Sequence, residues 1–149
     1  MHPPVLFFLV CPDSPKLDRY DWLVNILLQL MPAVPSIYCW AGGQVLQAHI
    51  NEYLWSNSSY FIPHSVGPVR PGIAEITIGD NHHEALKTKC VINASQQPLP
   101  MAIFSEKTSP ECFEWVSPDA KDLLRSRFKS YQNQGFKPKA LEFTPNVSL

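Results

Sequence analysis

The chain alternates between apolar runs of strand length and patterns of helix length, and this alternation constrains its fold more than any other feature. Residues 5–10 and 36–40 are largely apolar, as expected for strands whose two faces are both covered. A helical pattern follows each run, at residues 17–31 and 44–55. Strand, helix, strand, helix predicts a βαβ crossover, and therefore an α/β fold with a largely parallel sheet and helices on both faces.

Breaker and capping residues set the ends of the expected elements. The first helix is expected to stop at Pro32, with Asp13 or Ser14 as its N-cap. The last helix is expected over residues 119–134, with Pro118 near its first position and Gly135 just past its end. Strands are also expected at 74–78, 89–93 and 136–143, short strand or edge pieces at 101–104 and 113–116, and irregular chain at 63–72.

Size and charge exclude several classes of protein. A length of 149 residues is typical of one domain, and a content of 45% hydrophobic residues excludes a disordered tail or a coiled coil. The formal net charge of −1 leaves no bulk electrostatic attraction for nucleic acid. The fifteen prolines are spread along the chain and predict short elements with frequent breaks.

The pattern of cysteines and of apolar segments predicts a cytoplasmic protein. Cys11, Cys39, Cys90 and Cys112 are widely spaced with apolar neighbours, which favours buried free thiols over disulfides. The apolar run near the start lacks a preceding Lys or Arg and is shorter than the core of a signal peptide. The apolar stretch at 22–31 is too short to cross a bilayer.

Signals for catalysis are weak. Gly42-Gly43 lies between a strand and a helix, where phosphate could bind, but no phosphate-binding motif surrounds it and a plain turn is favoured. A small nucleotide-binding or hydrolytic α/β protein using this turn remains the alternative. His82-His83 with His64 and Glu84 could hold a metal, yet adjacent histidines do not share one face of a regular element, so a solvated loop is favoured.

The distribution of charge is more informative. Residues 121–139 contain six basic residues and one acidic residue, in a chain that is nearly neutral overall. On a helix, Lys121, Arg125 and Lys129 stack along one face at i, i+4 and i+8, and Phe128 lies beside them. This row is either a solvated helix face or a receptor for an acidic peptide or for phosphates.

Several segments resemble one known family. Residues 54–64 resemble its Leu-Trp, short spacer, Phe-x-Pro-His segment, and residues 123–131 with Gly135-Phe136 resemble its closing helix. Residues 73–78 and 91–93 match two of its strands in the same order. The family is the chi subunit of bacterial DNA polymerase III holoenzyme, and the similarity extends from the first strand to about Phe143.

The resemblance implies a single Rossmann-like domain over residues 1–143, followed by a tail at 144–149. It implies an accessory subunit of the replication machinery with no active site, cofactor or metal of its own. Phe128 stands where the family usually has Tyr, so the ring is kept and the hydroxyl is lost.

The resemblance also implies two partners and no membrane contact. The psi subunit, which connects chi to the clamp loader and so indirectly to DNA, would bind a surface that includes Trp55, Phe61 and Pro63. The acidic, Phe-terminated C-terminal tail of single-stranded-DNA-binding protein would bind at Lys121, Arg125, Phe128 and Lys129, with Val116 as a wall. Arg125 would pair with the terminal carboxylate, the two lysines would meet the acidic residues, and Phe128 would line the slot for the ring.

Overall fold

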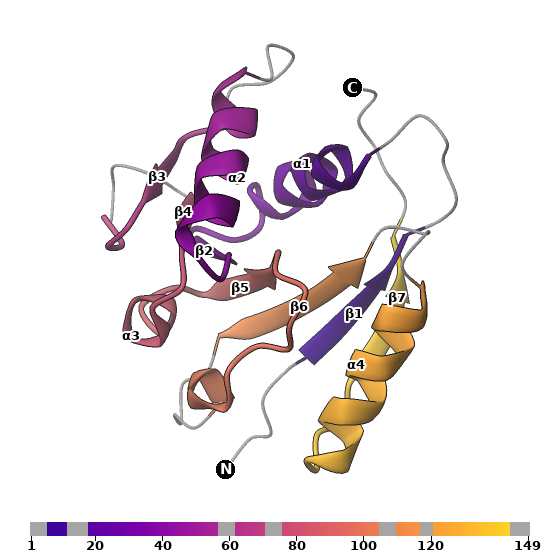
Figure 1. The fold of residues 1–149 in the computed structure, drawn as a ribbon. Helices are drawn as coiled ribbons and strands as arrows, with labels where there is room; N and C mark the ends of the chain where they lie inside the picture. Colours follow the sequence, from indigo (N-terminus) through magenta and orange to yellow (C-terminus); the bar gives the residue numbers. More distant parts are fainter. Residues whose placement is uncertain are drawn as a thin grey trace.

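Seven parallel strands form one sheet at the centre of the computed structural model, which describes residues 6–11, 18–56, 62–70, 76–104, 110–116 and 121–143. The spatial order of the strands is β3-β4-β2-β5-β6-β1-β7 (Figure 1). The strands are β1 Leu6–Val10, β2 Ile37–Trp40, β3 His64–Val66, β4 Ile76–Gly79, β5 Cys90–Asn93, β6 Glu111–Val116 and β7 Lys139–Glu142.

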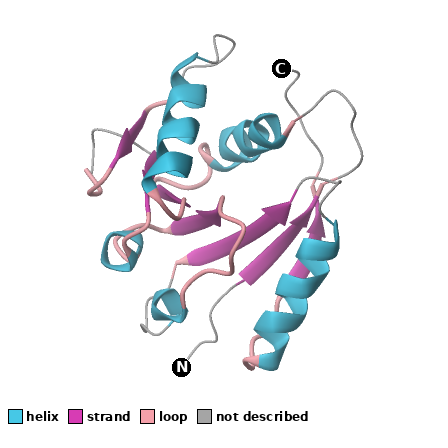
Figure 2. Ribbon diagram, in the orientation of Figure 1, coloured by secondary structure: helices cyan, strands magenta, loops and turns pink. Residues whose placement is uncertain are grey.

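Helices cover both faces of this sheet (Figure 2). They are α1 Arg19–Leu30, α2 Gln44–Ser56, α3 His82–Ala85, the 3-10 helix η1 Met101–Phe104 and α4 Lys121–Asn133. One apolar core lies between the sheet and α1 and α2, and contains Trp22 and Ile50. The second core lies on the other face, against α3, η1 and α4, and contains Tyr38 and Tyr131. The α/β fold predicted from the sequence is confirmed.

The first helix begins at a different cap from the one expected. Asp18 is the N-cap: its Oδ1 accepts from the Asp21 amide at 2.9 Å, while Asp21 Oδ2 accepts from the Asp18 amide at 3.1 Å. This reciprocal capping box satisfies amides that the helix itself leaves unpaired. The N-cap directly precedes the first helical residue, and α1 begins at Arg19. The prediction of Asp13 or Ser14 as the N-cap was therefore wrong.

Three short elements also differ from expectation. Residues 101–104 form η1 rather than a strand; Pro98 and Pro100 precede them, and the Ile103 amide bonds the Pro100 carbonyl at 3.1 Å. His82 and His83 lie in α3 rather than in a loop, because Asn81 caps that turn. Strand β3, at the sheet edge, was missed within a stretch expected to be irregular.

The end of α4 was predicted correctly. Gly135 has a φ of +93°, its amide bonds the Gln132 carbonyl at 3.0 Å, and the Phe136 amide bonds the Tyr131 carbonyl at 3.1 Å. This is a Schellman motif, in which glycine supplies the left-handed residue. The rings of Phe136 and Tyr131 lie 6.0 Å apart and add the apolar contact that accompanies this motif. The turn directs the chain into β7.

The four cysteines are buried and free, as expected. Burial raises the pKa of the Cys11, Cys39 and Cys90 thiols to about 12, and that of Cys112 further in the same direction. Within the described part of the chain, no helix is both long and apolar enough to span a membrane. The expected tail at 144–149 lies outside the described residues.

Candidate functional site

The cationic row on α4, defined as Lys121, Arg125 and Lys129, faces solvent. All three residues are exposed, and 77% of the Arg125 side chain is accessible. The Arg125 guanidinium lies 3.7 Å from Asp122 Oδ1, which is beyond hydrogen-bond distance, and Asp122 is itself fully exposed. An ion pair of this kind is weak, so Arg125 retains donors for a ligand.

Phe128 lies at the boundary between the cationic row and the buried side of α4. Its ring is half-buried and packs edge-on against Phe8 of β1, with the ring centroids 5.0 Å apart. Since successive helical residues turn by about 100°, the exposed edge of Phe128 lies next to Lys121 and Arg125. The structure therefore brings together the aromatic ring and the cations that the sequence predicted.

A hollow of about 330 Å³ opens at the N-terminal end of α4, where β1 and β7 end. Lys121 lines it together with Val10, Cys11, Ala140, Leu141 and Glu142. Val10 and Leu141 are exposed, at 36% and 43%, and the sequence reasoning did not assign them to this surface. Val116 pairs with Val10 in the sheet register, but its side chain lies outside the described residues. The hollow places apolar surface beside one cation of the row.

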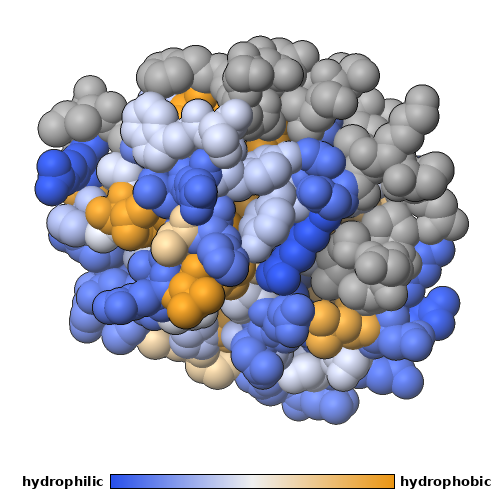
Figure 3. All heavy atoms as spheres, turned by 45° about the horizontal axis from the view of Figure 1, so that its top comes forward, coloured by the Kyte–Doolittle hydropathy of each residue, from blue (hydrophilic) through white to orange (hydrophobic). Residues whose placement is uncertain are grey.

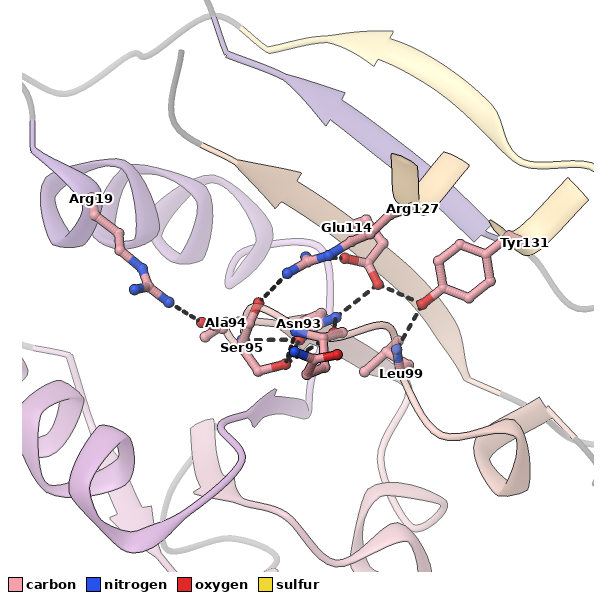
Figure 4. A network of polar contacts seen from close by, with 9 residues as sticks. Arg19, Asn93, Ala94, Ser95, Leu99, Glu114, Arg127 and Tyr131 are labelled. Carbon is pink, nitrogen blue, oxygen red and sulfur yellow. Dashed lines mark hydrogen bonds and ion pairs between the residues drawn. The ribbon is translucent and has the colours of Figure 1, made fainter. Parts of the chain in front are cut away.

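Arg127 does not belong to this surface, although the sequence counts it among the six basic residues. It is 2% exposed, and its Nη1 bonds Glu114 Oε1 of β6 at 2.7 Å (Figure 4). Its Nη2 donates to the Ser95 carbonyl at 2.7 Å. The charge of Arg127 is therefore neutralised internally and does not contribute to ligand attraction.

Glu114 is the centre of a buried polar network. Besides Arg127, it accepts from Asn93 Nδ2 at 2.8 Å and from the Tyr131 hydroxyl at 2.5 Å. Burial raises the pKa of the Glu114 carboxyl, while Arg127 and these two donors act in the opposite direction. Burial and the Glu114 carboxylate likewise raise the pKa of the Tyr131 hydroxyl. The network ties α4 to β5 and β6.

Trp55 lies at the opposite edge of the sheet, at the end of α2. It is 61% exposed, and its indole packs against the His64 ring of β3 with centroids 4.8 Å apart. His64 is held by the Ile62 carbonyl at 2.7 Å and by Asn51 Oδ1 at 3.1 Å. Pro63, half-buried, lies beside it. Phe61, expected on the same surface, lies outside the described residues.

These two surfaces are well separated. Strand β7, near α4, and strand β3, near Trp55, are the two ends of the sheet, so six inter-strand spacings place them about 29 Å apart. On the side that Figure 3 shows, hydrophobic surface occurs as small patches among hydrophilic residues. Two ligands of modest size could therefore occupy the two surfaces at once.

The Gly42-Gly43 turn binds an acidic side chain, that of Asp80, through a backbone amide. The Gly43 amide donates to Asp80 Oδ2 at 3.2 Å, which places a carboxylate at the N-terminal end of α2. A carboxylate there repels a phosphate and takes a donor that phosphate would need. Among the described residues, no three His, Cys, Asp or Glu side chains come close enough to hold a metal.

Comparison with known proteins gives one family and one fold. The sequence model of the family described as "DNA polymerase III chi subunit, HolC" matches residues 3–139. None of the curated proteins compared matches the chain. Among solved structures, the C-terminal domain of the DEAD-box protein Dbp5 is similar, with a TM-score of 0.56 and 13% identity over 94% of this chain and 91% of that one. That identity supports likeness of fold only. Because the family match spans nearly the whole sequence, the chain belongs to the DNA polymerase III chi subunit family.

Proposed function

We propose that this chain is a non-catalytic accessory subunit of DNA polymerase III that bridges two partners in the cytoplasm. The cationic row on α4 binds the acidic, Phe-terminated tail of single-stranded-DNA-binding protein, and the Trp55 surface binds the psi subunit, which leads to the clamp loader. Membership of the chi family supports the role in replication. The solvent-facing arrangement of Lys121, Arg125 and Lys129 beside Phe128 is the observation that carries the tail-binding part.

The chemistry of the cationic row suits such a tail. A terminal Phe carries a ring and a carboxylate on one residue, and the planar guanidinium of Arg125 can donate hydrogen bonds to both oxygens of that carboxylate. Lys121 and Lys129, one turn to either side, meet the preceding acidic residues. The Phe128 edge and the hollow that contains Val10 offer apolar surface for the ring.

The contact should be moderate in affinity and sensitive to salt. Exposed ion pairs contribute about 0–1 kcal/mol each and are screened at physiological ionic strength. Several tails on one DNA-bound tetramer would raise the effective affinity through avidity. Such a contact allows release and rebinding during strand synthesis.

Calorimetric titration with an acidic, Phe-terminated peptide tests the tail site. Arg125→Ala should weaken binding by about 1–3 kcal/mol, as expected for loss of a charge-assisted hydrogen bond. Arg70→Ala, which removes an exposed arginine from the loop after β3, is the matched control and should bind as the wild type does. Equal affinity of the wild type and Arg125→Ala would refute the site. If the wild type bound a single-stranded oligonucleotide and Arg125→Ala did not, the ligand of this surface would be nucleic acid instead.

The Trp55 surface supports a protein partner because an exposed aromatic side chain held by a buried platform is a typical interface anchor. Trp22, Trp40 and Trp115 are buried, so quenching of fluorescence by acrylamide reports mainly on Trp55. Addition of psi should protect this fluorescence from quenching. Trp55→Ala should abolish co-purification with psi and leave the peptide titration unchanged.

Met101→Ala is the matched control for the psi-binding experiment, because it removes an exposed apolar side chain from η1 on the other side of the sheet. It should retain psi. If Trp55→Ala abolished binding of both psi and the peptide, the proposal of two separate surfaces would fail.

A further inference from the structure

Helix α4 is attached to the sheet by apolar packing of Leu124, Phe128 and Tyr131 together with a buried polar contact. Its two fully buried residues are Arg127 and Tyr131, while Leu124 and Phe128 are only partly buried. Most helices on an α/β sheet are oriented by an apolar stripe that faces the core. Here, polar contacts of Arg127 and Tyr131 replace part of that stripe.

Both of these side chains converge on the carboxylate of Glu114. Arg127 Nη1 bonds Oε1 at 2.7 Å, and the Tyr131 hydroxyl bonds Oε2 at 2.5 Å (Figure 4). Glu114 is fully buried in β6, which is paired on both sides, by β5 and β1. The anchor point of α4 is therefore a strand held within the sheet.

The same two residues of α4 also hold the chain that follows β5. Arg127 Nη2 donates to the Ser95 carbonyl at 2.7 Å, and the Tyr131 hydroxyl accepts from the Leu99 amide at 2.7 Å. From the other face of the sheet, Arg19 Nη2 of α1 donates to the neighbouring Ala94 carbonyl at 2.6 Å. The planar guanidinium of Arg127 thus has two partners in different directions. Together with the packing of the Phe128 and Tyr131 rings on Phe8, these bonds fix the rotation of α4 about its axis.

We propose that Arg127 is a positioning residue for tail binding, an inference that rests on the proposed function. It lies two residues after Arg125 and two before Lys129, so any rotation of α4 that exposed Arg127 would turn both of those cations away from their present direction. The contact of Arg127 with Glu114 therefore keeps the cationic row facing the partner. Arg127 itself touches no ligand.

The test separates positioning from stability with a double variant, Glu114→Gln/Arg127→Met. Arg127→Met alone leaves a buried carboxylate without its cation, and the second change removes that charge while keeping an acceptor for Asn93 and Tyr131. Ile78→Ala, in the buried part of β4 far along the sheet from α4, supplies a control that loses stability without touching the network.

Two measurements are made on each protein: titration with the acidic, Phe-terminated peptide, and amide hydrogen exchange over residues 121–133. In the double variant, the peptide should bind about tenfold more weakly, equal to about 1.4 kcal/mol, and the α4 amides should exchange faster than in Ile78→Ala. Ile78→Ala should bind the peptide within about twofold of the wild type.

Wild-type affinity in the double variant would overturn the inference whatever its exchange over α4, as would an equal loss of affinity in Ile78→Ala. If the wild type itself does not bind the peptide, the proposed function fails. The positioning role then fails with it, whereas a wild type that binds the peptide and a double variant that binds equally well would overturn the positioning role alone.

Discussion

Replacing Arg127 with Met removes the guanidinium that faces the buried Glu114 carboxylate, and we predict a large loss of stability. Both side chains are almost wholly buried, at 2% and 0% exposure, so solvent cannot replace the lost contact. Removing one partner of a buried ion pair costs about 3–5 kcal/mol. A domain of this size has a free energy of unfolding of about 5–15 kcal/mol, so this one change removes a substantial fraction of it.

The free energy of unfolding that Arg127→Met loses should be larger at high pH than at low pH. Burial raises the pKa of Glu114, and Arg127 is the largest influence that opposes this rise. Without Arg127, the folded-state pKa rises further above its unfolded value of about 4.3. A carboxyl with a raised folded-state pKa favours folding when it is protonated, so the stability deficit should shrink as the pH falls from 8 towards 5.

Urea denaturation of the wild type and Arg127→Met at pH 8, 6 and 5 measures this deficit. The comparison with Glu114→Gln/Arg127→Met is the control, because that protein carries no buried carboxylate and its deficit should be nearly independent of pH over this range. A deficit below about 1 kcal/mol at pH 8, or one that grows as the pH falls, would refute the account of the network.

Three further predictions concern the fold. Gly135→Ala should lower the free energy of unfolding by about 1–2 kcal/mol, because the φ of +93° at this position is unfavourable for any side chain; denaturation with urea measures it. Gly79→Ala should cost about 1–3 kcal/mol in the same assay, since an added Cβ would press on the Tyr38 phenol, whose hydroxyl is held by the Asn81 amide. The buried thiols, such as Cys39 with a pKa of about 12, should not react with a thiol reagent at pH 8 until the protein unfolds, and rapid labelling of the folded protein would contradict this.

Much of the fold could be predicted from local patterns. The apolar runs at 36–40 and 89–93 became β2 and β5, and the helical pattern at 44–55 became α2 almost residue for residue. Gly135 ended the last helix because a left-handed position there needs glycine. By contrast, η1 could not be told from a strand, since four apolar residues carry no periodicity that separates the two.

The cationic row was predictable from spacing alone, because residues at i, i+4 and i+8 share a face of any helix. The burial of Arg127 could not be predicted in this way. It depends on the ion pair with Glu114, which lies in another element, so the sequence near Arg127 gives no signal for it. Val10 was likewise missed: it ends a buried strand, and only the tertiary fold places it next to Lys121. Tertiary pairing, rather than local sequence, decides which charged and apolar residues reach the surface.

The location of tail binding can be measured directly by mapping amide chemical shifts in the nitrogen-15-labelled protein during addition of the acidic, Phe-terminated peptide. We expect the largest changes at residues 121–129 of α4 and at Val10 and Leu141 in the adjacent hollow, with α2 and β3 unaffected. Changes concentrated around Trp55, or on the Gly42-Gly43 turn, would contradict the assignment of α4 as the tail-binding surface.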